Sequence, residues 1–333
     1  MSVYISHTSA LRFWSSFETS TPLLAQIMQP RHSPSWRTRA PLPSSSKATS
    51  QDIRRLSELD VGGLSYPVHI LASSERARSR HSKAVCHVCA GSFPRSSFVR
   101  IDKGIYASSP ELCFVQMALD LPFAALVRLG FELCGTYGIP TVAKPDYRFS
   151  VPFTTVARLE RFVDAATGMP GARTARAALQ HLVSGSASAM ETTLTMLLCL
   201  PFRLGGYGLP KPLMNNRVDP KGRTRFAAEE RCYYCDLLWP DIGMALEYDS
   251  SQFHGAKTSA ADAKRRTDLL NRGIVVISVT NRSVRNLIEL DGIARALGKK
   301  LGTRRRCDED AWRARQHDLH GMLLESAFLT VRD

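Results

Sequence analysis

The order of hydrophobic patterns in the second half of this 333-residue chain limits its fold more than any other feature. After the small polar run Ser184-Gly185-Ser186, apolar residues at helical spacing alternate with short apolar runs typical of strands. The predicted elements are a helix over about 187–200, strands near 213–218, 231–238 and 244–249, a helix over about 258–272, a strand over about 273–280 and a helix over about 284–301. This order predicts a mixed sheet flanked by helices, an α/β architecture.

Acidic side chains gather on one face of the predicted strand 244–249. Side chains alternate along a strand, so Glu247 and Asp249 lie on the same face. The turn sequence Pro-Asp-Ile-Gly at 240–243 closes a hairpin that brings Asp236 alongside this pair. Neighbouring carboxylates repel one another unless a cation compensates them, and hard oxygen ligands are those that Mg²⁺ or Mn²⁺ prefers. An edge hairpin with solvated acids is the alternative interpretation.

The same region carries the motifs of a nuclease family. Glu247-x-Asp249 is followed by His254, by Asp262-x-x-Arg265 in the next helix and by a glycine that opens the last strand. Upstream, the sequences SASAME at 186–191 and GLPKP at 208–212 match the family's first helix and first turn. Together they resemble the small Vsr-like endonuclease domain of the PD-(D/E)XK nuclease superfamily. The resemblance covers residues 184–302 and implies a restriction-endonuclease-like αβββαβ core with a mixed sheet.

This resemblance implies a metal-dependent DNA endonuclease that hydrolyses phosphodiester bonds. Glu191, Asp236 and Glu247 would hold Mg²⁺ or Mn²⁺, and Asp249 would supplement or replace one of these ligands. His254 would act on the leaving group or cap its loop. Asp249 stands where the superfamily usually has Lys, as is common in the Vsr-like branch, and serine replaces the glycine that follows. A DNA-binding regulator that keeps the nuclease fold without cleaving is the alternative.

Basic residues near the predicted site are candidates for DNA binding. Arg265 follows Asp262 by one helical turn, a spacing that favours an ion pair within the helix and also allows a phosphate contact. Beyond the last predicted helix, residues 303–333 form a predicted basic extension. Its run Arg304, Arg305 and Arg306 lies too far along the chain to complement the end of that helix, so we expect it to hold the DNA backbone.

Charge and composition narrow the classes of partner. Lys and Arg together number 44 against 30 Asp and Glu, which gives a net charge of +14 and favours a polyanion such as DNA over an acidic membrane. No uninterrupted apolar stretch approaches the roughly 18–20 residues of a membrane span, and no secretory signal is evident. We therefore expect a cytoplasmic protein. Cys86-x-x-Cys89 and Cys232-x-x-Cys235 are interpreted as structural cysteines, with zinc binding as the alternative.

The first half of the chain divides into a tail and a domain. Residues 1–50 contain 12 Ser, 5 Thr and 5 Pro without hydrophobic periodicity, which predicts a disordered basic tail. Residues 51–183 form a predicted smaller α+β domain. The sequences LSYPVH at 64–69, GIYASSPE at 104–111 and GFELCGTY at 130–137 resemble AbiEi-type regulators of type IV toxin–antitoxin systems. That resemblance implies a toxin or antitoxin protein as a partner.

Overall fold

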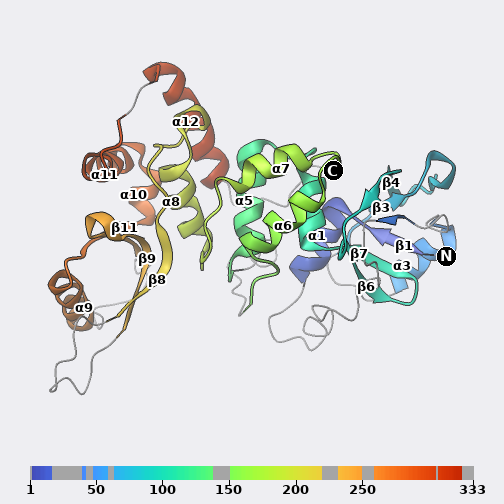
Figure 1. Ribbon diagram of the computed structural model, residues 1–333, viewed down its shortest axis with the longest axis horizontal. Helices are drawn as coiled ribbons and strands as arrows, with labels where there is room; N and C mark the ends of the chain where they lie inside the picture. Colours follow the sequence, from blue (N-terminus) through green and yellow to red (C-terminus); the bar gives the residue numbers. More distant parts are fainter. Residues whose placement is uncertain are drawn as a thin grey trace. The chain divides into compact units, whose positions relative to one another are not determined.

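The chain divides into two compact units. The computed structural model describes residues 2–16, 40–42, 48–58, 64–137, 151–219, 232–249, 259–304 and 307–324. Unit 1 comprises Met1–Leu182 with Ser326–Asp333, and unit 2 comprises Val183–Glu325, each shown in Figure 1. The division falls beside the Ser-Gly-Ser run at 184–186, where the composition of the sequence changes. Among the described residues, no helix has both the length and the apolar character needed to cross a bilayer.

Unit 2 is built on a four-stranded mixed sheet with the strand order β11-β10-β9-β8. Strands β8, β9 and β10 form an antiparallel meander, and β11 pairs parallel to β10. The elements are α8 (Ala189–Cys199), η3 (Phe202–Leu204), β8 (Leu213–Val218), β9 (Tyr233–Trp239), η4 (Pro240–Ile242), β10 (Met244–Asp249), α9 (Ser259–Asn271), β11 (Val275–Thr280), α10 (Asn281–Arg285), α11 (Leu287–Lys300) and α12 (Glu309–Leu324). The predicted α/β class with a mixed sheet is confirmed.

A glycine sets the geometry of the hairpin between β9 and β10. Gly243 has a φ of 58°, and a Cβ at this position would lie 2.2 Å from the carbonyl oxygen of Gly273. The carbonyl of Gly243 accepts a hydrogen bond of 2.8 Å from the amide of Val275. The left-handed conformation and the close approach both require glycine. The turn therefore joins the start of β10 to the start of β11 and keeps the two parallel strands in register.

The segment 303–333 is not simply the predicted basic extension, because its described part contains a helix that packs within unit 2. Trp312 of α12 is fully buried, and its indole nitrogen donates a 2.9 Å hydrogen bond to the carbonyl of Gly206. Its ring meets those of Phe202 and Tyr207 edge-on. Arg313 pairs with Asp291 of α11 at 2.5 Å. Only a few apolar residues of α12 face the core, and the charged residues around them concealed its packing.

Unit 1 contains a five-stranded sheet with the strand order β4-β3-β1-β7-β6. The described helices α4 to α7 pack mainly on one another, and α1 packs on α4 and β3. The elements are β1 (Val3–Ile5), α1 (His7–Ser16), β2 (Ala40–Pro41), α3 (Ser50–Glu58), β3 (Val68–Ala72), η2 (Glu75–Ala77), β4 (Ala84–Val88), β5 (Ser92–Phe93), β6 (Phe98–Asp102), β7 (Ile105–Ser108), α4 (Pro110–Met117), α5 (Phe123–Cys134), α6 (Val156–Ala165) and α7 (Ala172–Leu179).

The predicted disordered tail is wrong for its first residues. Strand β1 is the central strand of the sheet, parallel to β7 and antiparallel to β3, and all three of its residues are buried. The indole nitrogen of Trp14 in α1 donates to the carbonyl of Ser108 at 2.9 Å. A three-residue strand carries too little local signal to stand out from a Ser- and Thr-rich segment. Its stability comes from pairing with strands about 65 and 100 residues further along the chain.

Three histidines from separate elements stack at the edge of this core. The rings of His7 and His87 lie 3.6 Å apart, and Nδ1 of His69 lies 2.9 Å from Nε2 of His87. Burial, followed by the neighbouring imidazoles, lowers the pKa of His7 to about 3. Burial, followed by His69 and Arg78, lowers the pKa of His87 to about 4. At neutral pH His7 and His87 are therefore stacked as uncharged rings.

These lowered pKa values predict that acid destabilises unit 1. Below the ordinary histidine pKa of 6.5 the unfolded chain takes up protons that the folded chain does not, so stability present above pH 6.5 falls as the pH drops towards 4. At pH 5 the loss should be roughly 2 kcal/mol for His7 and less for the more solvent-screened His87. The measurement is the protection of the β1 amides against hydrogen exchange at pH 7 and at pH 5, each corrected for the intrinsic exchange rate. The difference in protection gives the loss of stability.

The variant His87→Phe keeps a ring in the stack and removes one titrating group. It should shrink the difference in β1 protection between pH 7 and pH 5, whatever its effect on protection at pH 7. His81→Gln, which removes a histidine outside the stack, should leave the difference as in the unmodified chain. An equal pH effect in all three proteins would contradict the role of the stack.

Candidate functional site

Glu247 and Arg265 join strand β10 to helix α9. Nη1 of Arg265 lies 2.5 Å from Oε2 of Glu247, and Nη2 donates to the backbone carbonyl of Tyr234 in β9. The Glu247 side chain is 14% exposed, and its Oε1 has no hydrogen-bond partner within the described part of the chain. Burial raises the pKa of Glu247, while Arg265 opposes this shift. The predicted pairing of Arg265 with Asp262 is thus replaced by an ion pair with the strand.

Asp236 lies on the neighbouring strand β9. Its Oδ2 accepts a 2.8 Å hydrogen bond from the amide of Tyr248, next to Glu247 in β10. Burial raises the pKa of Asp236, and the hydrogen bond and the charge of Arg265 partly oppose the shift. Because it accepts a hydrogen bond from the main chain of β10, the Asp236 carboxylate is held between β9 and β10. The hairpin therefore brings Asp236 to Glu247, as strand alternation and the turn predict.

Glu191 approaches the same carboxylate from helix α8. Ser188 caps the helix by accepting a hydrogen bond from the amide of Glu191, whose Oε2 accepts in turn from the amide of Ala187 at 2.9 Å and from Nδ2 of Asn215 at 2.5 Å. Burial raises the pKa of Glu191, and the negative charge of Asp236 raises it further. This reciprocal cap explains why a buried glutamate in the first turn is tolerated.

Asp236 is the middle member of a chain of three carboxylates. Burial raises the pKa of both Glu191 and Glu247, and the charge of Asp236 raises both further. The described residues nevertheless contain no group of three His, Cys, Asp or Glu side chains that converge closely enough to bind a metal ion. The donor set itself suits a hard divalent cation, because all three groups are carboxylates and the orphaned Oε1 of Glu247 lacks a partner. Arg265 supplies the positive charge in this conformation.

The other predicted site residues have different outcomes. Asp249 is the last residue of β10, half-buried and two residues from Glu247. His254, Arg305 and Arg306 lie outside the described residues, and Arg304 is exposed beyond the end of α11. Asn215 was not predicted, because nothing in strand 213–218 distinguishes it. Only the meander, which places β8 beside β9, reveals its contact with Glu191.

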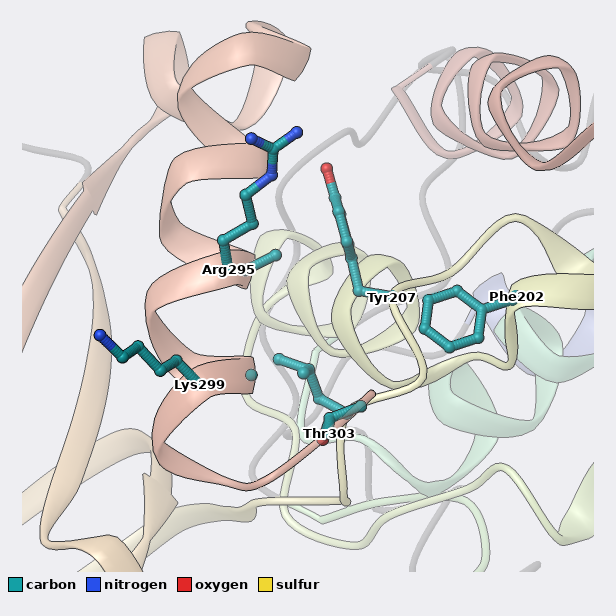
Figure 2. Close-up of a pocket in the computed structure, with 8 residues that line it drawn as sticks. Phe202, Tyr207, Arg295, Lys299 and Thr303 are labelled. Carbon is teal, nitrogen blue, oxygen red and sulfur yellow. The ribbon is translucent and has the colours of Figure 1, made fainter. Parts of the chain in front are cut away.

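A separate cavity of about 330 Å³ lies between helix α11 and the chain that follows α8. In Figure 2 the ring of Tyr207 stands between α11 and Phe202, while the Lys299 ammonium points away from both rings. The hydroxyl of Tyr207 bonds to Asp291, which also pairs with Arg313 at 2.5 Å and Arg295 at 3.6 Å. The carboxylate of Asp291 thus holds α11, α12 and Tyr207 together. This cavity does not include the carboxylates.

Comparisons of the chain with protein-family models, with curated proteins and with solved structures gave no match. The function is therefore argued from the geometry of unit 2 and from its charges.

The ion pair between Arg265 and Glu247 predicts a strong energetic coupling. Arg265→Ala leaves a buried carboxylate uncompensated and should lower the free energy of unfolding by about 1–3 kcal/mol, less than for a fully buried pair because the Arg265 side chain is 30% exposed. Adding Glu247→Gln should recover most of this loss. A double-mutant cycle in urea, followed by fluorescence, measures the coupling. Strictly additive losses would contradict it.

Proposed function

We propose that unit 2 is a metal-dependent DNA endonuclease domain with a PD-(D/E)XK core. The observation that carries the proposal is the run of Glu191, Asp236 and Glu247, whose pKa values are all raised by burial at one side of a mixed sheet. Such a concentration of buried acids lowers the stability of the folded state. Proteins keep groups that lower stability mainly at functional sites. The order helix, three strands, helix, strand from α8 to β11 supports the same proposal, and the net charge of +14 of the whole chain suits a polyanionic partner.

The four acidic residues of the site would act as metal ligands in phosphodiester hydrolysis. Glu191, Asp236 and Glu247 would hold Mg²⁺ or Mn²⁺, with Asp249 as an additional or replacement ligand. The bound ion would polarise the scissile phosphate and lower the pKa of the attacking water. The amide of Tyr248 fixes the Asp236 carboxylate, and the caps at Ala187 and Asn215 fix that of Glu191. These contacts orient the acids before substrate arrives.

The alternative is a DNA-binding regulator that does not cleave. The observation in its favour is the contact of Arg265 with Glu247, because the guanidinium already compensates a carboxylate that the metal would need. The resemblance of residues 51–183 to AbiEi-type regulators extends this alternative to a component of a toxin–antitoxin pair. Cleavage of DNA distinguishes the two, since only the endonuclease requires Glu247 as an acid.

The endonuclease proposal predicts cleavage of supercoiled plasmid. The full chain with Mg²⁺ or Mn²⁺ should nick or linearise the DNA, and EDTA should stop the reaction. Glu247→Gln keeps the size of the side chain and removes its charge, so the rate should fall by at least about a hundredfold. Agarose gels of the plasmid forms over time give the rates.

Asp241→Asn is the matched control, because Asp241 is an exposed carboxylate at the turn end of the same hairpin, away from Glu247. Its rate should equal that of the unmodified chain. Retained DNA binding without cleavage in either metal would favour the regulator. Equal cleavage by Glu247→Gln would exclude this carboxylate from the reaction and assign the activity elsewhere.

A further inference from the structure

A basic cleft opens at the same edge of the sheet as the carboxylates. Strands β10 and β11 are parallel, and Asp249 is paired with Thr280 at their last residues. Helix α10 begins at the next residue, Asn281. Since the carboxyl ends of parallel strands meet at one edge, α10 starts beside the end of β10 that carries Glu247 and Asp249. An open cleft of about 700 Å³ lies over α10, the start of α11 and α12.

The lining of this cleft suits a polyanion. It includes Arg282 and Arg285 of α10 and His317 and His320 of α12, with two asparagines and one leucine, and no carboxylate belongs to it. Each of these basic pairs is spaced by three residues, so its members share one face of their helix. Helices α10 and α12, which α11 separates along the chain, therefore both contribute nitrogen-bearing side chains to one space; the course of the three helices can be followed in Figure 1.

The arginines of the cleft retain charge for a ligand. Arg282 is 79% exposed and its contact with Glu289 is long, at 3.6 Å. Arg285 donates to the neutral side chain of Asn281 at 3.1 Å. Exposed ion pairs of this kind contribute little, because solvent screens them. Both guanidinium groups can therefore exchange these contacts for stronger, charge-assisted bonds to phosphate.

Helix α12 forms one wall of the cleft, and two contacts hold this helix in place. Nε2 of His320 lies 2.8 Å from the carbonyl of Val284, and a carbonyl only accepts, so this nitrogen carries the proton. The buried Trp312 anchors the helix two turns earlier. His320 thus ties α12 to α10, which sets His317 one turn away on the same face. The side chains on the two sides of the cleft are therefore placed relative to each other by the contact between α10 and α12.

We infer that this cleft binds phosphates of the DNA strand that enters the carboxylate site. The inference rests on the proposed function, which makes DNA the ligand. It adds that the phosphate backbone of this DNA lies along the cleft. The lining of the cleft contains no Phe, Tyr or Trp, and the long arginine side chains hold a backbone without reading its sequence. Binding should therefore depend strongly on salt and little on sequence.

The salt dependence of DNA binding tests the inference. Fluorescence anisotropy of a labelled duplex with EDTA present measures affinity in the absence of cleavage. If both arginines contact phosphates, Arg282→Ala with Arg285→Ala should reduce the slope of log affinity against log salt by up to about 1.8. Changing both residues to Lys keeps the charges and should keep most of the slope. Because Arg282 and Arg285 both lie in exposed positions, unfolding midpoints should stay unchanged.

The matched control removes two other cations from unit 2. Arg295 and Lys299 lie roughly two and three turns further along α11, beside the cavity of Figure 2. Changing both to Ala should alter the slope less than changing the arginines of the cleft. An unchanged slope in the Arg282 and Arg285 variant, or an equal reduction in the control, would overturn the inference.

The outcomes for the cleft and for the endonuclease are distinguishable. A cleft-dependent slope without plasmid cleavage would support the cleft and overturn the endonuclease proposal alone. Cleavage with an unchanged slope would overturn only the cleft. Failure of the unmodified chain to bind DNA at low salt would overturn both.

Discussion

The contact between Arg265 and Glu247 holds helix α9 against the sheet at the place where carboxylates are buried. One guanidinium bridges two strands, because it bonds to the side chain of Glu247 in β10 and to the carbonyl of Tyr234 in β9. Without a cation there, the neighbouring charges of Asp236 and Glu247 would repel each other in a poorly solvated site. The pair acts together with the buried Leu269 and with the 2.6 Å hydrogen bond from the Tyr233 hydroxyl to Asp268, which also fix α9 on the sheet.

Strand alternation and turn chemistry predicted the part of the site that lies within one hairpin. The bounds of β8 and β10 match the predicted strands 213–218 and 244–249, and Gly243 in the turn fixes how β10 meets its neighbours. The partner of Arg265 could not be predicted in this way, because Asp262 on the same helix offered a local pair. Choosing between a partner three residues away and one 18 residues away requires the packing of the helix on the sheet.

Composition was a poor guide at both ends of the chain for the same physical reason. Strand β1 is three residues long, and α12 places Trp312 and two leucines among charged residues. Neither segment could bury enough surface alone, and each is stabilised by partners distant in sequence: β3 and β7 for the strand, Gly206 and Tyr207 for the helix. A prediction from local composition reflects the polar residues that make up most of such a segment. It does not identify the few residues that pack against distant parts of the chain.

The parallel pairing of β10 with β11 places the exposed Arg282 and Arg285 just beyond the edge of the sheet where the carboxylates lie. Glu247 faces a buried environment, whereas Arg282 and Arg285, which follow β11, are exposed. Because both strands end at the same edge, acids that suit a divalent cation and arginines that suit phosphate lie next to each other without sharing a strand. An arginine on β10 itself would pair with the acids, as Arg265 does from α9. Placing the cations after β11 keeps them near the carboxylates and leaves their charge for an external anion.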